Sequence, residues 1–251
     1  MKATTIDINC DLGEGESQKD CDLDALLMPY ISSCNIACTG HAGNEFTMGE
    51  SLRNAHKNKL KIGAHPGYPD KKNFGRISLP MTENQLAESL INQIDSLITI
   101  AAEEQCLVQH IKFHGALYND AENDPSLALQ LAKIIHQFYP SKTIIGLAGG
   151  TLETASKDLG LCFLAEGFID RSYRSDGKLT PRSVTGAIIE DQKICLKQAI
   201  ALATKKSITT IDKQLIKPRV DSLCLHSDNP QALLLIIALN EAFKIAGIDI
   251  Q

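Results

Sequence analysis

Three side chains that can move protons or hold anions alternate along one short apolar segment in the middle of the chain. His110, Lys112 and His114 occupy every second position at the end of the segment 106–114. Residues two apart in a β-strand share a face, so the three are expected on one side of a strand. A buried ammonium and two imidazoles are costly unless they face a polar cavity. The segment therefore predicts the centre of a polar site.

Polar side chains also follow other predicted strands. The candidates of this kind are Asn9, Asp11, Glu14, His41, His65, Asp170, His226 and Asp228. A single histidine after a strand is usually structural, whereas four at equivalent positions favour a common site. The remaining histidines, His56 and His136, lie in predicted helices and are expected at the surface.

The elements that must position these residues alternate between strand and helix. Apolar segments predict strands at 4–10, 33–38, 61–65, 106–113, 143–148, 161–165, 207–211 and 220–225. Helical spacing and caps predict helices at 23–31, 46–59, from a capping box at 82–85, from a cap at 124–125, at 151–160, at 191–204 and from a cap at 229–230 to Gly247. Such alternation is typical of a parallel sheet with right-handed crossovers. The candidate residues lie in six different connections between strand and helix, and they can meet at one site only if the sheet closes into a ring. We therefore expect one irregular α/β barrel of seven or eight parallel strands spanning residues 1–251.

Composition excludes several classes of function. The chain has 251 residues and a formal charge of −5, so it lacks the basic footprint of a nucleic-acid-binding protein. It has neither a run of about 18 apolar residues nor an apolar leader, which predicts a cytoplasmic protein without a membrane partner. The eight cysteines form no CxxC pair and are expected to be reduced; five lie in strand-like apolar segments and are expected to be buried. These five are Cys10, Cys34, Cys38, Cys162 and Cys224.

The predicted site permits chemistry with or without a metal ion. Asp11, His65 and His114 would be the ligands to test for zinc or another divalent ion. However, no HExxH motif supports a metal, and Lys112 would add a second positive charge, so we assign no metal ligand. Lys112 could stabilise negative charge on a carbonyl or phosphate oxygen, or it could form a buried pair with Asp11 or Glu14.

A polar connection of about twenty residues is predicted at 166–185, which is longer than most loops. Asp170 and Arg171 within it could clamp a carboxylate or phosphate, or the loop could be solvated and form a contact between copies of the chain. The sequence contains no GxxxxGK[ST] motif, so any ATP would not be bound by a P-loop.

Taken together, several long motifs in fixed order resemble the LamB/YcsF family. They are IDINCDLGE at 6–14, NIACTGHAG at 35–43, IGAHPGYPD at 62–70, HIKFHGALYN at 110–119, DR at 170–171, DG at 176–177 and PRS at 181–183. The resemblance implies an irregular barrel related to the glycoside hydrolase/deacetylase superfamily. It also implies ATP-dependent opening of the lactam 5-oxo-L-proline (5-oxoproline) to L-glutamate, with ATP as co-substrate and two partner 5-oxoprolinase subunits, B and C.

Lactam opening suggests a role for each candidate residue. Asp11 and one of His65 or His114 would act as general base, with Lys112 holding the oxyanion or phosphate. Arg171 or Arg76 would bind the substrate carboxylate. The other expected substrate-binding residues are Asn9, Glu14, His41, Asp170, His226 and Asp228.

Three positions differ from the residues that are usual in the family's motifs. Two other functions also remain open. Asn44 replaces an acidic residue, Phe113 a proline and Ser227 a glycine, which bears on substrate and activity. The first alternative is a metal-dependent amide or sugar deacetylase on the same barrel. The second is a non-catalytic subunit that binds the substrate.

Overall fold

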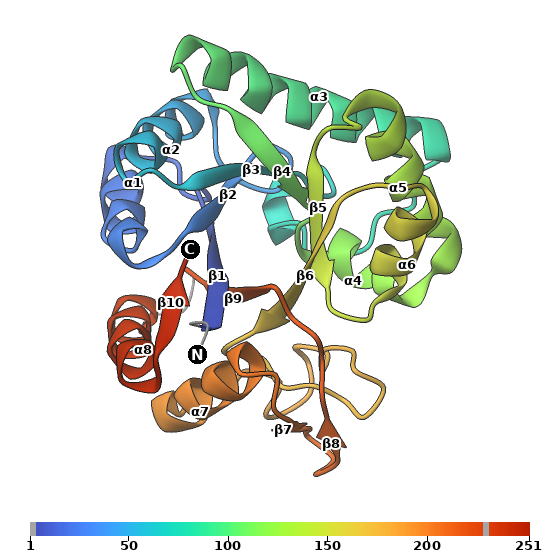
Figure 1. Cartoon of the computed structure of the whole chain (residues 1–251). Coiled ribbons are helices and arrows are strands. Elements are labelled where there is room, and N and C mark those ends of the chain that lie inside the picture. Colours follow the sequence, from blue (N-terminus) through green and yellow to red (C-terminus); the bar gives the residue numbers. More distant parts are fainter. Residues whose placement is uncertain (1–3, 228–230) are drawn as a thin grey trace.

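The computed structural model describes residues 4–227 and 231–251. Its centre is a closed ring of parallel strands surrounded by helices (Figure 1). In ring order the strands are β1 (Thr4–Leu12), β2 (Ser33–Ala37), β3 (Lys61–His65), β4 (Val108–Lys112), β5 (Thr143–Leu147), β6 (Phe163–Phe168) and β9 (Ser222–His226), which pairs again with β1. A further parallel strand, β10 (Ile248–Ile250), pairs with residues 4–6 of β1. The predicted barrel of seven or eight parallel strands is confirmed.

Helices connect successive strands and bury their apolar faces against the ring. They are α1 (Gln18–Ala25), α2 (Glu45–Lys57), α3 (Glu83–Glu103), α4 (Gly115–Asn123), α5 (Pro125–Phe138), α6 (Thr151–Asp158), α7 (Gln192–Ala203) and α8 (Ala232–Ala246). The predicted caps of two of them are present: Thr82 and Gln85 form a capping box on α3, and Asp124 accepts a hydrogen bond from the Ser126 amide at 2.8 Å. The cap predicted for α8 at 229–230 lies outside the described residues.

Several elements differ from the sequence-based expectation. The helix predicted at 23–31 is instead α1 followed by a 3₁₀ turn, Met28–Tyr30, because Pro29 lacks the amide that a continuing helix needs. Helix α4 was not predicted. The strand expected at 207–211 is β7 (Ile208–Thr209), which pairs with β8 (Leu215–Ile216) outside the barrel.

Two predictions around β6 also need correction. The predicted loop at 166–185 begins too early, because Glu166 and its neighbours complete β6. Cys162, expected to be buried, is exposed because it precedes the first residue of that strand, whereas Cys10, Cys34, Cys38 and Cys224 are buried as expected. All eight cysteines are free thiols.

The interior of the barrel is polar, unlike the branched apolar filling that is usual in (β/α) barrels. Along β1, Asp7, Asn9 and Asp11 alternate with residues of the apolar core and are all at least nine-tenths buried. Asp7 accepts a hydrogen bond from the Ser33 hydroxyl at 2.8 Å, and the Asn35 amide donates to both Asn9 and Asp11 at 2.8 Å. These bonds satisfy buried polar groups that would otherwise destabilise the fold.

One glycine makes room for this polar interior. A Cβ atom on Gly63 of β3 would lie 2.1 Å from two ring atoms of His110 on the neighbouring strand. The His110 ring is in turn held by its Nε2, 2.8 Å from Oδ1 of Asn35. Position 63 therefore needs glycine because of the close approach of this ring.

We expect the Gly63→Ala substitution to lower the free energy of unfolding by about 1–3 kcal/mol, the usual cost of overpacking a core. The same substitution in a His110→Ala background should cost much less, because the obstructing ring is gone. Urea unfolding of the single and double variants measures both values. Equal costs in the two backgrounds would contradict this account of Gly63.

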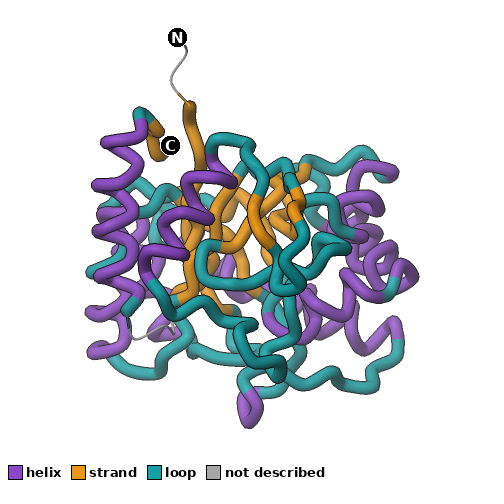
Figure 2. Tube along the Cα trace, turned by 90° about the horizontal axis from the view of Figure 1, so that it is seen from below, coloured by secondary structure: helices purple, strands orange, loops and turns teal. Residues whose placement is uncertain are grey.

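Loops gather at the end of the barrel where the strands have their carboxyl ends (Figure 2). The longest, 169–191, contains no helix and carries two isolated bridges, Arg171 to Ile188 and Tyr173 to Leu179. Within the described ranges, no helix has the length and apolar character needed to cross a bilayer. The carboxyl ends of the strands and this long loop together frame the site described next.

Candidate active site

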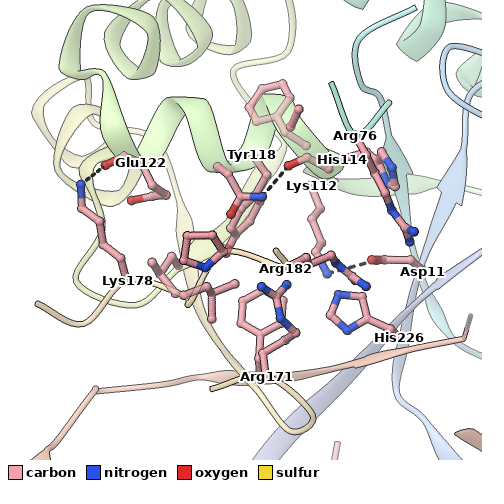
Figure 3. A pocket seen from close by; sticks show the side chains of 18 of the residues that line it. Asp11, Arg76, Lys112, His114, Tyr118, Glu122, Arg171, Lys178, Arg182 and His226 are labelled. Carbon is pink, nitrogen blue, oxygen red and sulfur yellow. Dashed lines mark hydrogen bonds and ion pairs between the residues drawn. The ribbon is translucent and has the colours of Figure 1, made fainter. Parts of the chain in front are cut away.

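A pocket of about 460 Å³ opens at the carboxyl ends of the strands (Figure 3). Eight of the residues singled out in the sequence line it: Asp11, Glu14, His65, Arg76, Lys112, His114, Arg171 and His226. Three further candidates lie behind the residues that line the pocket. Asn9 contacts Lys112, His41 contacts His114 and Asp170 contacts His226. Asp228 lies outside the described residues. The sequence thus identified much of one shared cavity, while the roles assigned to its residues remain predictions.

Lys112 of β4 forms the floor of the pocket. Its side chain is almost fully buried, and its Nζ lies 3.0 Å from Oδ1 of Asp11, 3.0 Å from Oδ1 of Asn9 and 3.1 Å from Oε2 of Glu166. The Cys224 sulfur lies at 3.1 Å. Three ammonium hydrogens face four neighbours, so Lys112 has no hydrogen to offer a ligand without giving up one of these contacts.

Charge pairing keeps the floor of the pocket ionised. Burial alone would raise the pKa of Asp11, but the charges of His65 and Lys112 outweigh it and hold this pKa well below its usual range. Burial alone would lower the pKa of Lys112, but Asp11 and other groups raise it well above its usual value. Burial raises the pKa of the Cys224 thiol, so this side chain stays neutral. The expectation that Lys112 pairs with Asp11 agrees with this geometry.

Three histidines and a glutamate converge beside this pair. The rings of His41 and His114 stack in parallel with centroids 3.5 Å apart, and Nδ1 of His114 lies 3.0 Å from Nε2 of His65. Oε1 of Glu14 lies 3.2 Å from Nε2 of His41 and 3.4 Å from Nδ1 of His114. Each residue lies at or just after the carboxyl end of a different strand, which is why a closed barrel brings them together.

The second ring nitrogen of two histidines is fixed by a backbone carbonyl. Nδ1 of His65 lies 2.8 Å from the Lys112 carbonyl oxygen, and Nε2 of His114 lies 2.9 Å from the Phe74 carbonyl oxygen. A carbonyl oxygen can only accept, so both nitrogens must donate a hydrogen. Burial holds the pKa of His114 well below its usual value. Burial would also lower the pKa of His65, but the charge of Asp11 outweighs it and raises that pKa.

Asp170 acts behind the pocket wall. Its Oδ1 lies 2.9 Å from Nδ1 of His226, whose ring stacks on Phe168 with centroids 5.6 Å apart. Burial would raise the pKa of Asp170, but His226 outweighs it and lowers this pKa, so the carboxylate is ionised. The arrangement fixes the orientation of His226, with its Nδ1 directed at the carboxylate.

Cationic side chains surround the mouth. Among the described residues that line the pocket, six are basic, namely Arg76, Lys112, Arg171, Arg174, Lys178 and Arg182, against the acidic Asp11, Glu14 and Glu122. Arg171 is buried and donates to the carbonyl oxygens of Thr180 at 2.7 Å and Ala187 at 3.3 Å, so it fixes the long loop. Burial lowers its pKa to about 10, which leaves it charged at neutral pH. Arg76 and Arg182 are exposed and face the entrance.

Three polar residues next to the predicted ones were missed. Glu166 of β6 is fully buried against Lys112, Asn35 of β2 bridges Asn9 and Asp11, and Glu122 of α4 lines the pocket. A carboxylate within the apolar segment that became β6 was a signal for Glu166, whereas Glu122 lies on a helix that the sequence did not predict.

Two of the three residues that differ from the family's usual motifs have a structural explanation. Asn44 caps α2 by accepting a hydrogen bond from the Thr47 amide at 3.0 Å, and its own amide donates to the Glu16 carbonyl at 3.1 Å, which an acidic residue could not do. The Ser227 hydroxyl donates to the Asp11 carbonyl at 2.6 Å. Phe113 is buried and lines the pocket.

Fold and site together define a parallel α/β barrel whose strand ends carry a buried lysine–carboxylate pair and a histidine cluster. The chain belongs to the LamB/YcsF family, whose family model matches residues 6–251. Two proteins named as the A subunit of 5-oxoprolinase, from Chloroflexus aurantiacus and Chloroflexus aggregans, are each 37% identical to it, over 98% of this chain and 98% of each relative.

Solved structures agree with this assignment. A lactam utilization protein from Thermus thermophilus superposes with a TM-score of 0.91 at 30% identity, over 98% of this chain and 99% of the other. A putative cellobiose-phosphate cleavage protein from Enterococcus faecalis superposes with a TM-score of 0.64 at 10% identity, over 100% of this chain and 97% of the other. The second similarity concerns the fold alone.

We expect Lys112→Met to lower the free energy of unfolding by about 3–5 kcal/mol, because it leaves buried carboxylates without their counter-charge. Lys157→Met is the control; Lys157 pairs with Glu153 on the exposed surface of α6, where an ion pair contributes about 1 kcal/mol or less. Urea unfolding at neutral pH measures both. A Lys112→Met protein as stable as the control would show that the pair does not hold the barrel interior together.

Proposed function

We propose that this chain is the A subunit of an ATP-dependent 5-oxoprolinase, which opens the lactam of 5-oxo-L-proline to give L-glutamate together with subunits B and C. Two relatives that match this chain over almost their whole length are named as that subunit of 5-oxoprolinase. The similar Thermus thermophilus structure is named a lactam utilization protein. The membership in the LamB/YcsF family supports the same proposal.

The observation that carries the proposal is the placement of an ionised Asp11–Lys112 pair and a neutral His114 below a cationic pocket mouth. The substrate is a small anion with one carboxylate and one amide in a five-membered ring. Basic residues at the mouth would attract the carboxylate, and the polar floor would receive the ring.

Each step needed for lactam opening has a group in the pocket that can perform it. The lactam oxygen gains negative charge during attack, or a phosphoryl group if ATP is used, and the charge of Lys112 stabilises either. Since Lys112 is surrounded by its own partners, it acts through its electrostatic field. Nδ1 of His114 carries a lone pair, because its Nε2 donates to a carbonyl. It can accept the proton of an attacking water and then give it to the ring nitrogen, which becomes the amine of glutamate when the C–N bond breaks.

Exposed arginines at the mouth are assigned to the substrate carboxylate. The sequence suggested Arg171 or Arg76 for this role. Arg171 already donates through Nε and Nη2 to carbonyl oxygens of its own loop. We therefore assign the carboxylate to Arg76 and Arg182, with Arg171 supporting the loop on which Arg182 lies.

In a complex reconstituted with subunits B and C, His114→Ala should lower the rate of ATP-dependent glutamate release on the order of a hundredfold, the usual effect of losing a group that transfers a proton. The matched control, His136→Ala, changes an exposed histidine of α5 and should leave the rate unaltered. Glutamate is measured with and without ATP and with and without the partners. If His114→Ala keeps more than about a tenth of the rate, His114 is not a proton acceptor in the reaction. Release of glutamate without ATP would instead favour a simple amide hydrolase.

Replacing Arg182 by Gln should raise KM for 5-oxoproline about tenfold or more while kcat changes little, because a charge-assisted hydrogen bond to the carboxylate is lost from substrate and transition state alike. Arg219→Gln removes an exposed arginine that does not line the pocket, and it serves as the control. Steady-state kinetics of the complex separates the two constants. A fall in kcat with unchanged KM would move Arg182 from substrate binding to the reacting centre.

A further inference from the structure

One part of the molecule, the basic sector (residues 171–217), carries a charge opposite to that of the whole chain. It holds ten basic and four acidic residues, a formal charge of +6, whereas the complete chain has −5. The rest of the chain therefore holds fifteen basic and twenty-six acidic residues, a formal charge of −11. Charge asymmetry of this size bears on association rather than on the fold, so it indicates a partner of the opposite charge.

The basic sector occupies one side of the barrel, next to β6 and β9. It comprises most of the loop 169–191, helix α7 and the hairpin of β7 and β8, which Figure 1 shows together beside the ring. The loop and the hairpin contact each other. The Ile211 amide donates to the Tyr173 carbonyl at 2.8 Å, and a Cβ atom on Gly186 would lie 3.7 Å from Cδ1 of Ile211. Loop and hairpin are therefore parts of one surface.

The lysines of this surface have no counter-charge. Six of them are exposed: Lys193, Lys197, Lys205, Lys206, Lys213 and Lys217. Among the residues that the structure describes, the lysines in ion pairs are Lys61, Lys112 and Lys157, none of which belongs to the basic sector. Unpaired ammonium groups on a surface can meet the carboxylates of a partner without first losing a partner of their own.

Apolar side chains are exposed among these charges. Leu215 of β8 is 71% exposed, and Val184, Ile188 and Ile211 are each more than a third exposed. Val184 follows directly on Ser183, which lines the pocket, so this surface reaches the pocket mouth. Exposed apolar residues within a polar rim are typical of a surface that binds another protein.

We propose that the basic sector is the docking surface for an acidic face of the partner subunits B and C, an inference that rests on the proposed function. A partner bound there would lie beside the substrate, because the surface reaches the pocket mouth. The negative charge of the remaining chain does not oppose this docking. Exposed charges more than about 8 Å apart are largely screened at physiological ionic strength, so the local positive charge dominates the contact.

Three other occupants fit this surface less well. A small anion would bind at the mouth, whereas Lys193, Lys213 and Lys217 do not line the pocket. An anionic bilayer against the basic sector would cover the mouth through which a water-soluble substrate enters. A second copy of the chain would have to present a different, acidic surface, and contacts between unlike patches build open chains unless they close into a ring.

Binding of the full chain to a complex of subunits B and C tests the proposal. The triple variant Lys193→Glu, Lys213→Glu and Lys217→Glu should lower the association rate constant at least about tenfold, because steering by opposite charges contributes about 10–10³-fold. The loss should shrink at about 1 M salt, where the Debye length is about 3 Å. Biolayer interferometry at several salt concentrations measures the rate constants.

A matched control triple, Lys19→Glu, Lys57→Glu and Lys133→Glu, reverses exposed lysines of α1, α2 and α5. It changes the net charge by the same amount and should bind the subunits like the wild type. Glutamine at the three test positions removes the charges without reversing them and should slow association to a smaller extent. Circular dichroism checks that each variant is folded. Equal binding by the test and control triples overturns the proposal, and so does a wild-type chain that binds neither subunit.

Two further measurements identify a different occupant. Binding of the wild-type chain to vesicles that contain anionic lipids, lost in the test triple, would assign the basic sector to a membrane. Self-association of the wild-type chain, lost in the same variant, would assign it to a second copy. Either result in place of subunit binding overturns the proposal.

Glutamate release in the same samples separates this inference from the proposed function. Docking through the basic sector without ATP-dependent glutamate release would reject the proposed function and keep the docking surface. ATP-dependent release at limiting subunit concentration that is equal in the test and control triples, together with equal binding, would do the reverse.

Discussion

The burial of one ammonium group governs the interior of this barrel. Lys112 lies almost fully out of contact with water, which costs several kcal/mol for a lone charge in a protein interior. The carboxylates of Asp11 and Glu166 compensate for it, at 3.0 and 3.1 Å from Nζ. Because both carboxylates lie on strands other than that of Lys112, the charge balance exists only when the ring is closed. Folding of the barrel and assembly of the site floor are thus the same event.

The polar layers below Lys112 extend this constraint through the barrel. Asn35 donates to Asn9 and Asp11, and Asp7 accepts hydrogen bonds from serines of the neighbouring strands. Each layer links strands that are distant in sequence, so a change in register would leave several buried groups without partners. The hydrophobic core lies instead between the outer faces of the strands and the helices. Ile8 of β1, Leu52 of α2 and Leu90 of α3 belong to this continuous core.

The sequence predicted the barrel and most of the pocket because strand ends are easy to recognise. Histidines directly after short apolar segments, as at His41 and His65, needed no knowledge of tertiary structure to be grouped. Glu166 and Asn35 were not predicted as site residues, because the interior of a barrel is normally apolar and no local pattern shows which strand residues point inward. The roles of Arg171 could not be separated either, since a guanidinium that binds a ligand and one that binds its own loop have the same sequence signature.

The hydrogen bonds of Arg171 go to the main chain at Thr180 and Ala187, and not to any side chain of the loop. This part of the anchoring of segment 171–188 is therefore insensitive to which side chains the tip of the loop carries. Arg182 at the entrance could be exchanged for a neutral or acidic residue while these bonds stay in place, whereas the Lys178 ammonium donates to the Glu122 carbonyl at 2.7 Å and holds the loop to α4. Because Arg171 holds the main chain while Arg182 only faces the entrance, evolution or engineering could change this loop to direct the barrel toward molecules of a different charge.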